Sequence, residues 1–223
     1  MKINHLIKVM LGIHKSIYIN FKMFKFKDAI KFPILLSDNV KIKSLKGKIN
    51  INSEIKSGII KVGFGDVGTF DIKKRRSILQ IDGIWEIGKN ISLGHGTKIS
   101  IGKNGILKMG NNITITAETA IICHKDIKIG NGCLISWDNL IMDTDFHKIY
   151  SIEDVKKRKN NDLPINIGND VWIGCRCTIL KGSNIKNMSV ISSNSRISSN
   201  ISKENVVIGD NGLILKEKIF WKF

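Results

Sequence analysis

Six isoleucines near the C-terminal end of the chain follow one another at intervals of six residues. They are Ile167, Ile173, Ile179, Ile185, Ile191 and Ile197. An α-helix repeats about every 3.6 residues and a flat strand every two, so neither element gives this spacing by itself. A period of six arises when the backbone returns to the same environment after each short strand and turn. The spacing therefore predicts a β-helix, a solenoid in which each side of a coil is one short strand.

The same period occurs upstream in four shorter registers. Their members are Ile81, Ile87, Leu93 and Ile99; Ile101, Leu107 and Ile113; Ile115, Ile121 and Ile127; and Ile129, Ile135 and Ile141. Successive registers are offset by two residues, which preserves the inward-facing parity of a strand. We expect an all-β chain whose β-helix covers 81–216, with a polar segment, 143–166, looped out where the repeat fails.

The N-terminal part of the chain predicts a different structure. Apolar residues recur at helical spacing over 3–18 with lysines between them, which indicates an amphipathic helix. Such a helix either caps the open end of the solenoid, the role that we favour, or docks on an anionic membrane surface. The chain then divides into a helical cap (1–39), irregular early β coils (40–80), the β-helix (81–216) and a C-terminal tail (217–223).

The charge of the chain narrows the classes of partner. Lys and Arg number 36 against 19 Asp and Glu, a formal net charge of +17. This balance favours nucleic acid, a lipid surface or phosphorylated small molecules as partners, or it reflects a solvated basic surface without a specific partner. The basic run at 73–76 has no interleaved aromatic residues, so we expect an exposed turn there and no nucleic-acid binding.

Cysteine usage and the N-terminus bear on the compartment. Cys123, Cys133, Cys175 and Cys177 form no C-x-x-C pair and no regular framework. We therefore expect reduced thiols, with Cys177 buried in the core. Charged residues interrupt the N-terminal apolar stretch and no small-residue cleavage site follows, so neither a signal peptide nor a transmembrane span is expected. The expected location is the cytoplasm or the inner membrane surface.

The looped-out segment opens with Asp143, Asp145 and His147. A histidine titrates near neutral pH, and a carboxylate just upstream can orient its ring and stabilise its protonated form. The cluster fits a general base, or else a loop histidine that is hydrogen-bonded for structural reasons. His95, His124 and His147 lack the close pair that a three-histidine zinc site needs, so we expect no metal.

Two segments resemble a known family. The run Ile167–Gly174 (IGNDVWIG), followed by Thr178–Gly182 (TILKG), resembles the hexapeptide-repeat acyltransferases. The run DTDFH at 143–147 resembles the active-site segment of their sugar and polysaccharide O-acetyltransferase branch. The resemblance spans roughly residues 80 to 216. It implies a left-handed parallel β-helix, a homotrimer with active sites between subunits, and acetyl-CoA as acyl donor.

The resemblance also implies roles for single residues. His147 would be the base that takes the proton from an acceptor hydroxyl, which then attacks the thioester directly, without an acyl-enzyme. Either Asp145 or Asp143 would orient His147. The residues expected beside the cofactor are Trp172, Cys175, Ser192 and Ser193, with apolar packing the alternative for Trp172. The residues expected beside the acceptor are Ser136, Trp137 and His95, with a turn the alternative for His95.

The chain departs from the family pattern near its C-terminal end. Serine and asparagine occupy positions 192–195 and 198–200, where relatives carry small residues and a Thr-Lys-Asp run. Leu213 stands where a basic residue is expected. The cations that hold the CoA phosphates would therefore come from elsewhere, and the candidates are Lys216, Arg196, Lys203 and the cluster at 156–159.

The sequence thus predicts an acetyltransferase that moves acetyl from acetyl-CoA to a hydroxyl of a sugar or surface polysaccharide precursor. The basic charge suits polyanionic CoA and an acceptor linked to a nucleotide or a lipid diphosphate. Two alternatives stay open at this point. One is an N-acetyltransferase that acts on an amino sugar or an antibiotic, and the other is a non-catalytic β-helix scaffold without a cofactor site.

Overall fold

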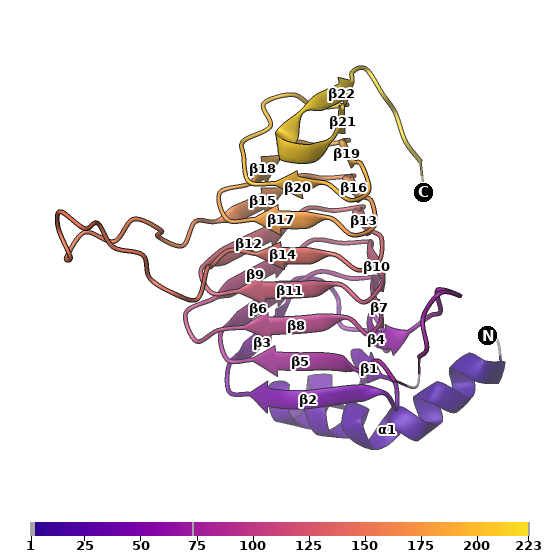
Figure 1. Ribbon diagram of the computed structural model, residues 1–223. Coiled ribbons are helices and arrows are strands. Elements are labelled where there is room, and N and C mark those ends of the chain that lie inside the picture. The colour runs from indigo at the N-terminus through magenta and orange to yellow at the C-terminus, as the bar shows by residue number, and fades with distance from the viewer. Residues whose placement is uncertain (1–2, 73, 223) are drawn as a thin grey trace.

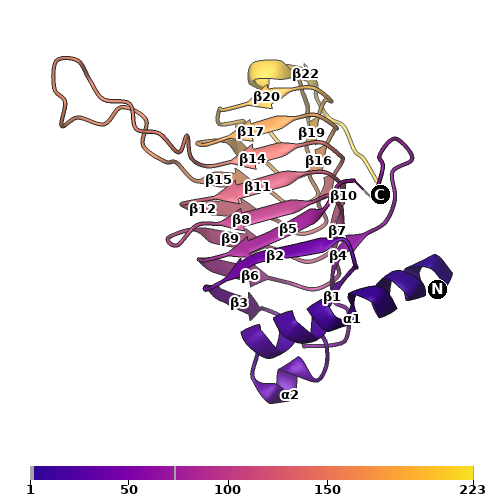
Figure 2. The ribbon, with the colours of Figure 1, turned by 60° about the horizontal axis from the view of Figure 1, so that its bottom comes forward.

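The chain forms a parallel β-helix with three faces, as the period of six predicts (Figure 1). The computed structural model describes residues 3–72 and 74–222. Lys73 of the basic run and Phe223 of the tail lie outside the described residues. In Figure 1 the strands at the front run from right to left while successive coils rise, so the superhelix is left-handed. Figure 2 shows the long helix α1 (Ile3–Met23) across the N-terminal end of the solenoid.

Each face is one sheet, and the chain visits the faces in the order A, B, C. Among the described residues, face A contains β1 (Ile34–Leu36), β4 (Ile60–Phe64), β7 (Ile91–His95), β10 (Ile113–Ala117), β13 (Leu134–Ile135), β16 (Trp172–Ile173), β19 (Val190–Ile191), β21 (Val207–Ile208) and β22 (Ile214–Lys216). Face B contains β2 (Val40–Leu45), β5 (Ser77–Ile81), β8 (Lys98–Ile101), β11 (Ala120–Cys123), β14 (Leu140–Met142), β17 (Thr178–Leu180) and β20 (Arg196–Ile197). Face C contains β3 (Lys48–Ile51), β6 (Ile84–Ile87), β9 (Ile106–Met109), β12 (Asp126–Ile129), β15 (Ile165–Ile167) and β18 (Asn184–Ile185).

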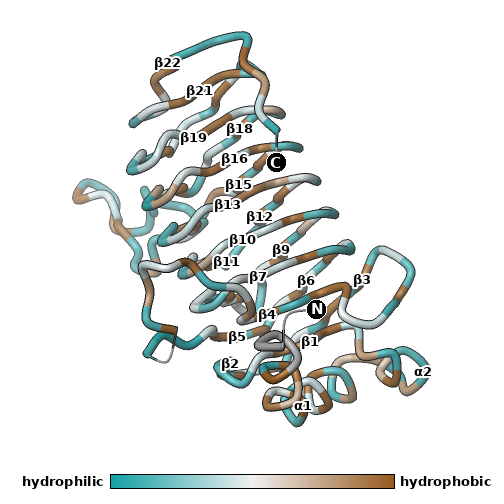
Figure 3. The backbone as a smooth tube through the Cα atoms, turned by 90° about the vertical axis from the view of Figure 1, so that its right-hand side faces the viewer, coloured by the Kyte–Doolittle hydropathy of each residue, from teal (hydrophilic) through white to brown (hydrophobic). Residues whose placement is uncertain are grey.

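Strand pairing explains the isoleucine spacing. Ile167 pairs with Ile185, Ile173 with Ile191, and Ile179 with Ile197. Each pair is 18 residues apart in the sequence, which is one coil of three faces at six residues per face. All six isoleucines of the ladder are at most 2% exposed. Apolar and polar residues alternate along the coils because successive side chains of a strand point to opposite sides (Figure 3).

The coils before the ladder are longer. Ile81 pairs with Ile101, and Ile87 with Met109, so these coils hold 20 and 22 residues. Their longer strands place two apolar side chains inward where the later strands place one, as in β8. The offset of two between registers therefore corresponds to one extra inward side chain and one extra outward side chain. The same hydrophobic core continues through the coils.

An asparagine column closes the corner between faces C and A. The Oδ1 atom of Asn131 accepts from Asn111 N, that of Asn169 from Asn131 N, and that of Asn187 from Asn169 N, each at 2.8 Å. Coils approach closely here, since a Cβ on Gly130 would lie 2.5 Å from the carbonyl oxygen of Gly168. Glycine is needed at this turn for the close approach of backbone to backbone.

The first coil begins at Ile34, inside the segment that the sequence assigned to the helical cap. Strand β1 pairs with β4, and β2 pairs with β5, in parallel as in later coils, with a register shift between Ile42 and Ser44 of β2. Helix α1 extends to Met23, five residues beyond its expected end, and the short helix α2 (Phe26–Ala29) follows. Among the described residues, no helix is both long and apolar enough to cross a membrane.

Helix α1 covers the otherwise unpaired edge of β1. Asn20 Nδ2 donates to the carbonyl oxygen of Ile34 at 2.7 Å, and Ile34 N donates to Asn20 Oδ1 at 3.1 Å. Leu36 N donates to Ser16 Oγ at 2.9 Å. Gly12 permits this contact, because a Cβ there would lie 2.0 Å from the Leu36 carbonyl oxygen. Side chains of the helix thus replace the hydrogen bonds of a neighbouring strand.

Candidate active site

The polar loop leaves the solenoid at the corner between faces B and C, after β14, and returns at β15 (Figure 1). Ile165 already pairs with Ile127, so the repeat resumes two residues earlier than expected and the loop covers 143–164. Asp143 is fully buried at the start of this loop. Its two carboxylate oxygens accept from His124 N at 2.7 Å and Lys125 N at 2.8 Å, one coil below. Asp143 therefore anchors the loop and is not available to orient His147.

A second carboxylate fastens the base of the loop to the coil above. We call this base, where residues 143–147 lie against residues 158–162, the neck of the loop. Asp145 Oδ2 accepts from Lys181 Nζ and, at 2.8 Å, from Asn160 Nδ2. These two hydrogen bonds, with Lys181 first, lower the pKa of the Asp145 carboxyl. Asp162 closes the same neck, accepting from Thr144 Oγ1 at 2.9 Å and pairing with Arg158 at 3.2 Å. The predicted pairing of Asp145 with His147 is thus replaced by a pairing with Lys181.

His147 sits on this fastened neck with its backbone fixed. Asn160 Nδ2 donates to the His147 carbonyl oxygen at 2.7 Å, and His147 N donates to the Asp145 carbonyl oxygen at 2.6 Å. Phe146 adopts a φ of 61° and packs edge-on against His124, with ring centroids 5.0 Å apart. The left-handed conformation is costly for a bulky residue, and such conformations concentrate at functional sites. The His147 side chain itself is exposed to solvent.

A second group of predicted residues lies on face A and at the corner between faces A and B. Trp172 is 38% exposed, and its indole Nε1 donates to Ser136 Oγ at 3.2 Å. Trp221 of the C-terminal tail packs against the Trp172 ring, with centroids 6.0 Å apart, and donates to the Asp170 carbonyl oxygen at 2.7 Å. Trp172 is therefore partly exposed, with its indole N–H hydrogen-bonded to Ser136 and its ring packed against Trp221. It is not buried in the apolar core.

Four more predicted residues lie at the corner between faces A and B, directly after strands of face A. The Cys175 thiol donates to Ser193 Oγ at 3.4 Å, and Asn194 N donates to the Cys175 carbonyl oxygen at 2.8 Å. The backbone N–H of Ser192 donates to the carbonyl oxygen of Ile208 on the next coil of face A. Trp137 lies on the coil below, and its carbonyl oxygen accepts from Arg176 N at 3.0 Å. Cys175, Ser193 and Trp137 thus line one column of the corner between faces A and B.

The two groups occupy different corners of the solenoid. Strand β14 lies between them on the same coil, because Trp137 precedes it and Asp143 follows it. In Figure 1 the loop projects to the left, whereas β13, β16 and β19 of face A lie on the right. One chain therefore presents His147 and the Trp172–Cys175 group on separate sides.

The candidate phosphate-binding cations differ in their availability. Arg196 Nη2 donates to Asn211 Oδ1 at 2.7 Å, and Lys203 pairs with Glu217 at 2.5 Å. Lys216 ends β22, which folds back antiparallel on β21, and is exposed. Lys156 and Lys157 are exposed at the tip of the loop. Lys216 and the loop lysines are therefore the candidates without a competing partner among the described residues.

His95 does not fit its predicted place beside the acceptor. It is 1% exposed, and the ring of Phe70 packs against it with centroids 5.8 Å apart. Burial lowers the pKa of its imidazole. The side chain therefore presents almost no surface to an acceptor sugar. Among the described residues, no three His, Cys, Asp or Glu side chains converge as a metal site.

The contacts of the loop neck carry no sequence signal. Lys181 and Asn160 are 36 and 15 residues from Asp145. Lys181 belongs to the run TILKG, but nothing in that run indicates a carboxylate partner. Asn139 is also buried, where its Oδ1 accepts from Cys177 N at 2.7 Å and its Nδ2 donates to the Ser136 carbonyl oxygen at 2.9 Å. Asn139 thereby connects Ser136, which accepts from the Trp172 indole, to Cys177 of the next coil.

Comparisons with known proteins bear on this arrangement. No protein-family profile matches the chain. Polysialic acid O-acetyltransferase of Neisseria meningitidis is 32% identical over 126 residues, which cover 43% of this chain and 58% of that protein. Galactoside O-acetyltransferase of Escherichia coli K12 is 27% identical over 150 residues, which cover 66% of this chain and 70% of that protein. The chain thus spans less than two thirds of the length of the meningococcal relative.

A solved structure supports the fold. The crystal structure of the polySia-specific acetyltransferase NeuO superposes with a TM-score of 0.58 over 86% of this chain and 79% of that chain, at 22% identity. At this identity the likeness concerns the fold alone. The chain is a homologue of the O-acetyltransferases of the hexapeptide-repeat family.

Proposed function

We propose that the protein transfers an acetyl group from acetyl-CoA to a hydroxyl of a sugar or surface polysaccharide precursor. The observation that carries the proposal is an exposed histidine on a fastened loop neck, in a chain whose relatives are named O-acetyltransferases. His147 has the right chemistry for a general base, because imidazole titrates near neutral pH. A basic chain also suits a polyanionic donor. The reaction would take place in the cytoplasm or at the inner membrane surface.

In the proposed reaction the acceptor hydroxyl gives its proton to the His147 imidazole as its oxygen attacks the thioester carbonyl. A C–O bond forms and the C–S bond breaks. The CoA thiolate leaves and takes the proton from the imidazolium, so the base is regenerated. Backbone N–H groups near the carbonyl would stabilise the developing oxyanion. No acyl-enzyme is required, which agrees with a histidine whose exposed ring has no nucleophilic side chain hydrogen-bonded to it among the described residues.

We further propose that a complete site needs two copies of the chain, as in a homotrimer. His147 projects on one side of the solenoid, and the group of Trp172, Cys175 and Ser193 lies on another. A symmetric assembly brings the loop of one copy against the corner between faces A and B of the next. Cys175, Ser192 and Ser193 would then line the donor channel, with Lys216, Lys156 and Lys157 toward the CoA phosphates.

A thiol-release assay with acetyl-CoA tests the base assignment. His147→Ala is expected to lower turnover by about a hundredfold or more, the usual contribution of a positioned acid–base group. His14→Ala removes an exposed histidine of α1 and serves as the matched control. Turnover of His147→Ala within a few-fold of the parent would refute the assignment.

Two further measurements separate the alternatives. Screening hydroxyl sugars against amino sugars distinguishes O-acetylation from N-acetylation, and preferential turnover of amino sugars would contradict the proposed acceptor. Calorimetric titration with CoA distinguishes an enzyme from a scaffold. Absence of CoA binding at about millimolar concentration would favour the non-catalytic scaffold, because a substrate site binds in the micromolar to millimolar range.

A further inference from the structure

Helix α1 turns its apolar side outward. Ile7, Met10, Leu11, Ile17, Tyr18 and Phe21 form one stripe at helical spacing, with His14 within it, and each is exposed. We call these six residues the α1 stripe. Met10 is 65% exposed and Leu11 56%. The opposite side of the helix, which covers β1, presents Gly12, Ser16 and Asn20 together with one fully buried apolar residue, Ile19.

This orientation is the reverse of an ordinary surface helix, which buries its apolar stripe against the core. Capping of the β1 edge needs the polar Ser16 and Asn20 inward, and the residues of the α1 stripe are then left facing solvent. An exposed apolar patch of this kind marks an interaction site. The stripe is therefore not explained by the capping role of the helix.

The apolar surface continues past the end of α1. Phe26 is 72% exposed and Ile30 50%. The Phe26 ring packs edge-on against Phe21 of the stripe, with centroids 6.1 Å apart. Aromatic side chains alternate with lysines in this segment, whose sequence is FKMFKFKDAIKF over residues 21–32. Interleaved aromatic and basic residues are typical of segments that lie in the interface of a membrane.

Positive charge is concentrated at the same end of the molecule. The first 50 residues contain eleven lysines and two acidic residues, Asp28 and Asp38. Lys22, Lys25, Lys27 and Lys31 are exposed along the segment that follows the stripe. Asp28 lies 4.0 Å from Lys31 and offsets one of these charges. The surface that carries the apolar residues is therefore strongly cationic.

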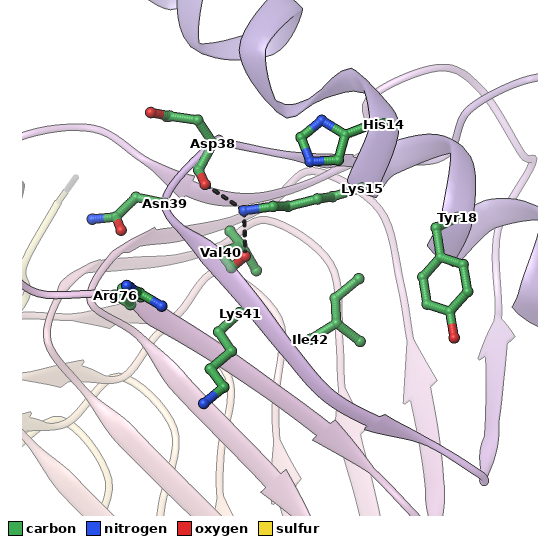
Figure 4. A pocket seen from close by; sticks show the side chains of 9 residues that line it. All are labelled: His14, Lys15, Tyr18, Asp38, Asn39, Val40, Lys41, Ile42 and Arg76. Atoms are coloured by element: carbon green, nitrogen blue, oxygen red, sulfur yellow. Dashed lines mark hydrogen bonds between the residues drawn. The ribbon is translucent and has the colours of Figure 1, made fainter.

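A basic cleft adjoins the stripe. It has a volume of about 670 Å³ and lies between α1 and β2, where Lys15, Lys41, Arg76 and His14 are among the lining residues (Figure 4). Tyr18 and His14 line both the cleft and the outward side of α1. Lys15 Nζ is held at the back of the cleft by the Val40 carbonyl oxygen at 2.9 Å. Asp38 is the acidic member of the lining, and its carbonyl oxygen also accepts from Lys15.

We propose that α1, α2 and the basic cleft dock the protein on a bilayer of anionic phospholipid. The α1 stripe and Phe26 enter the boundary between headgroups and acyl chains, and the cleft takes the phosphate of an anionic headgroup. Charge complementarity selects this occupant. A second copy of the chain would bring an equally cationic end against the first, whereas an anionic bilayer has the opposite charge. Docking is independent of the proposed acetyl transfer.

Vesicle flotation of the full chain tests the proposal. Vesicles contain phosphatidylcholine alone or phosphatidylcholine mixed with the anionic lipid phosphatidylglycerol. The parent is expected to float with the anionic vesicles and not with the neutral ones, and the binding should weaken with added salt. Equal recovery with both kinds of vesicle, or with neither, would overturn the proposal.

Variants locate the surface. The double variant Leu11→Asp and Ile17→Asp should bind anionic vesicles at least about tenfold more weakly, because it places charge in the apolar stripe. Its matched control, Ile152→Asp and Val155→Asp, changes two exposed apolar residues of the loop and should bind as the parent does. Equal loss in both variants would attribute binding to net charge alone and would contradict the stripe.

A second pair of variants tests the cleft. Lys41→Glu with Arg76→Glu should weaken binding by about tenfold, whereas Lys103→Glu with Lys218→Glu changes net charge equally at exposed sites elsewhere. An equal effect of both pairs would exclude the cleft.

Sedimentation of the parent and of the stripe variant tests whether a second copy of the chain binds this surface instead. If the stripe variant alone changes the oligomeric state and the parent ignores vesicles, the surface is an interface between copies.

Discussion

Lys181 donates a hydrogen bond to the Asp145 carboxylate and so joins the neck of the polar loop to the coil above it. The same ammonium donates to the carbonyl oxygen of Asn160 at 3.2 Å, in the segment of the loop that returns to the solenoid. One lysine therefore binds both sides of the neck. One of its two partners, Asp145, is two residues before His147 in the sequence. In this arrangement the position of the proposed base depends on a residue that follows β17 rather than on the loop itself.

Lys181→Met should lower kcat/KM by about ten- to a hundredfold, because a small displacement of a catalytic group has a large effect on rate. Global stability should change little, since the pair is partly open to solvent, with the Lys181 side chain 19% and the Asp145 side chain 38% exposed. Lys203→Met removes the comparable Lys203–Glu217 pair and serves as control. Steady-state kinetics and thermal unfolding of both variants check the expectation, and equal kinetics would contradict it.

The Asp145 carboxyl should titrate below the ordinary range of an aspartate. Its pKa is lowered by the hydrogen bond from Lys181 and then by that from Asn160. A group whose pKa is lower in the folded state stabilises that state above its unfolded pKa of about 3.9 and loses the contribution as the pH falls further. The neck should therefore loosen only in acid. Carboxyl NMR titration should show the Asp145 midpoint rise in Lys181→Met, and an unchanged midpoint would refute the pairing.

Asn20→Leu should destabilise the N-terminal coil by about 2–4 kcal/mol, because it leaves the Ile34 N–H and C=O without partners in a buried setting. Asn50→Leu, at an exposed position of β3, is the matched control. Hydrogen exchange of the Ile34 amide, together with thermal unfolding, measures the effect. Protection of Ile34 that survives in the variant would show that the helix side chain does not substitute for a strand.

Native thiol labelling should modify Cys175 and spare the other three cysteines. Cys123, Cys133 and Cys177 are buried, and burial raises the pKa of the Cys133 thiol to about 12. A neutral thiol is a poor nucleophile, so access and ionisation act together. Cys175 is half-buried beside Ser193. Mass spectrometry after labelling checks the pattern, and acetyl-CoA should slow the reaction if Cys175 lines the donor channel.

The core of this fold was predictable from the sequence because its period is enforced at every coil. Each isoleucine of the ladder has the same inward environment, so a slip of one residue would turn the whole strand outward. The start of the first coil was less visible. Strand β1 is a run of only three residues, and its edge is satisfied by Ser16 and Asn20, which look like ordinary polar residues of a helix.

The sequence was sufficient to predict the loop and its histidine. It was not sufficient to predict which groups the two carboxylates contact. Spacing suggested that Asp143 or Asp145 orients His147, since all three are neighbours in the chain. In the fold, Asp143 meets backbone N–H groups of the coil below and Asp145 meets Lys181 of the coil above. Such partners arise from the stacking of coils, and adjacency in the sequence does not reveal them.

Mixed assemblies should restore activity if the site forms between copies. His147→Ala removes the proposed base, and Trp172→Ala removes the aromatic edge of the other group, so each variant alone should be nearly inactive. When the two are unfolded and refolded together, about one quarter of the sites in random trimers combine an intact His147 from one copy with an intact Trp172 from the next. The thiol-release assay should then recover about that fraction of parent activity.

The control is a mixture of the two variants that has not been unfolded, which should stay inactive because the copies have not exchanged. His147 and Trp172 lie at different corners of one chain, so a site within a single chain would recover no activity in either mixture. Recovery only after refolding supports a shared site. No recovery, with trimers verified by sedimentation, would refute the shared site and leave the role of His147 to the single-variant kinetics.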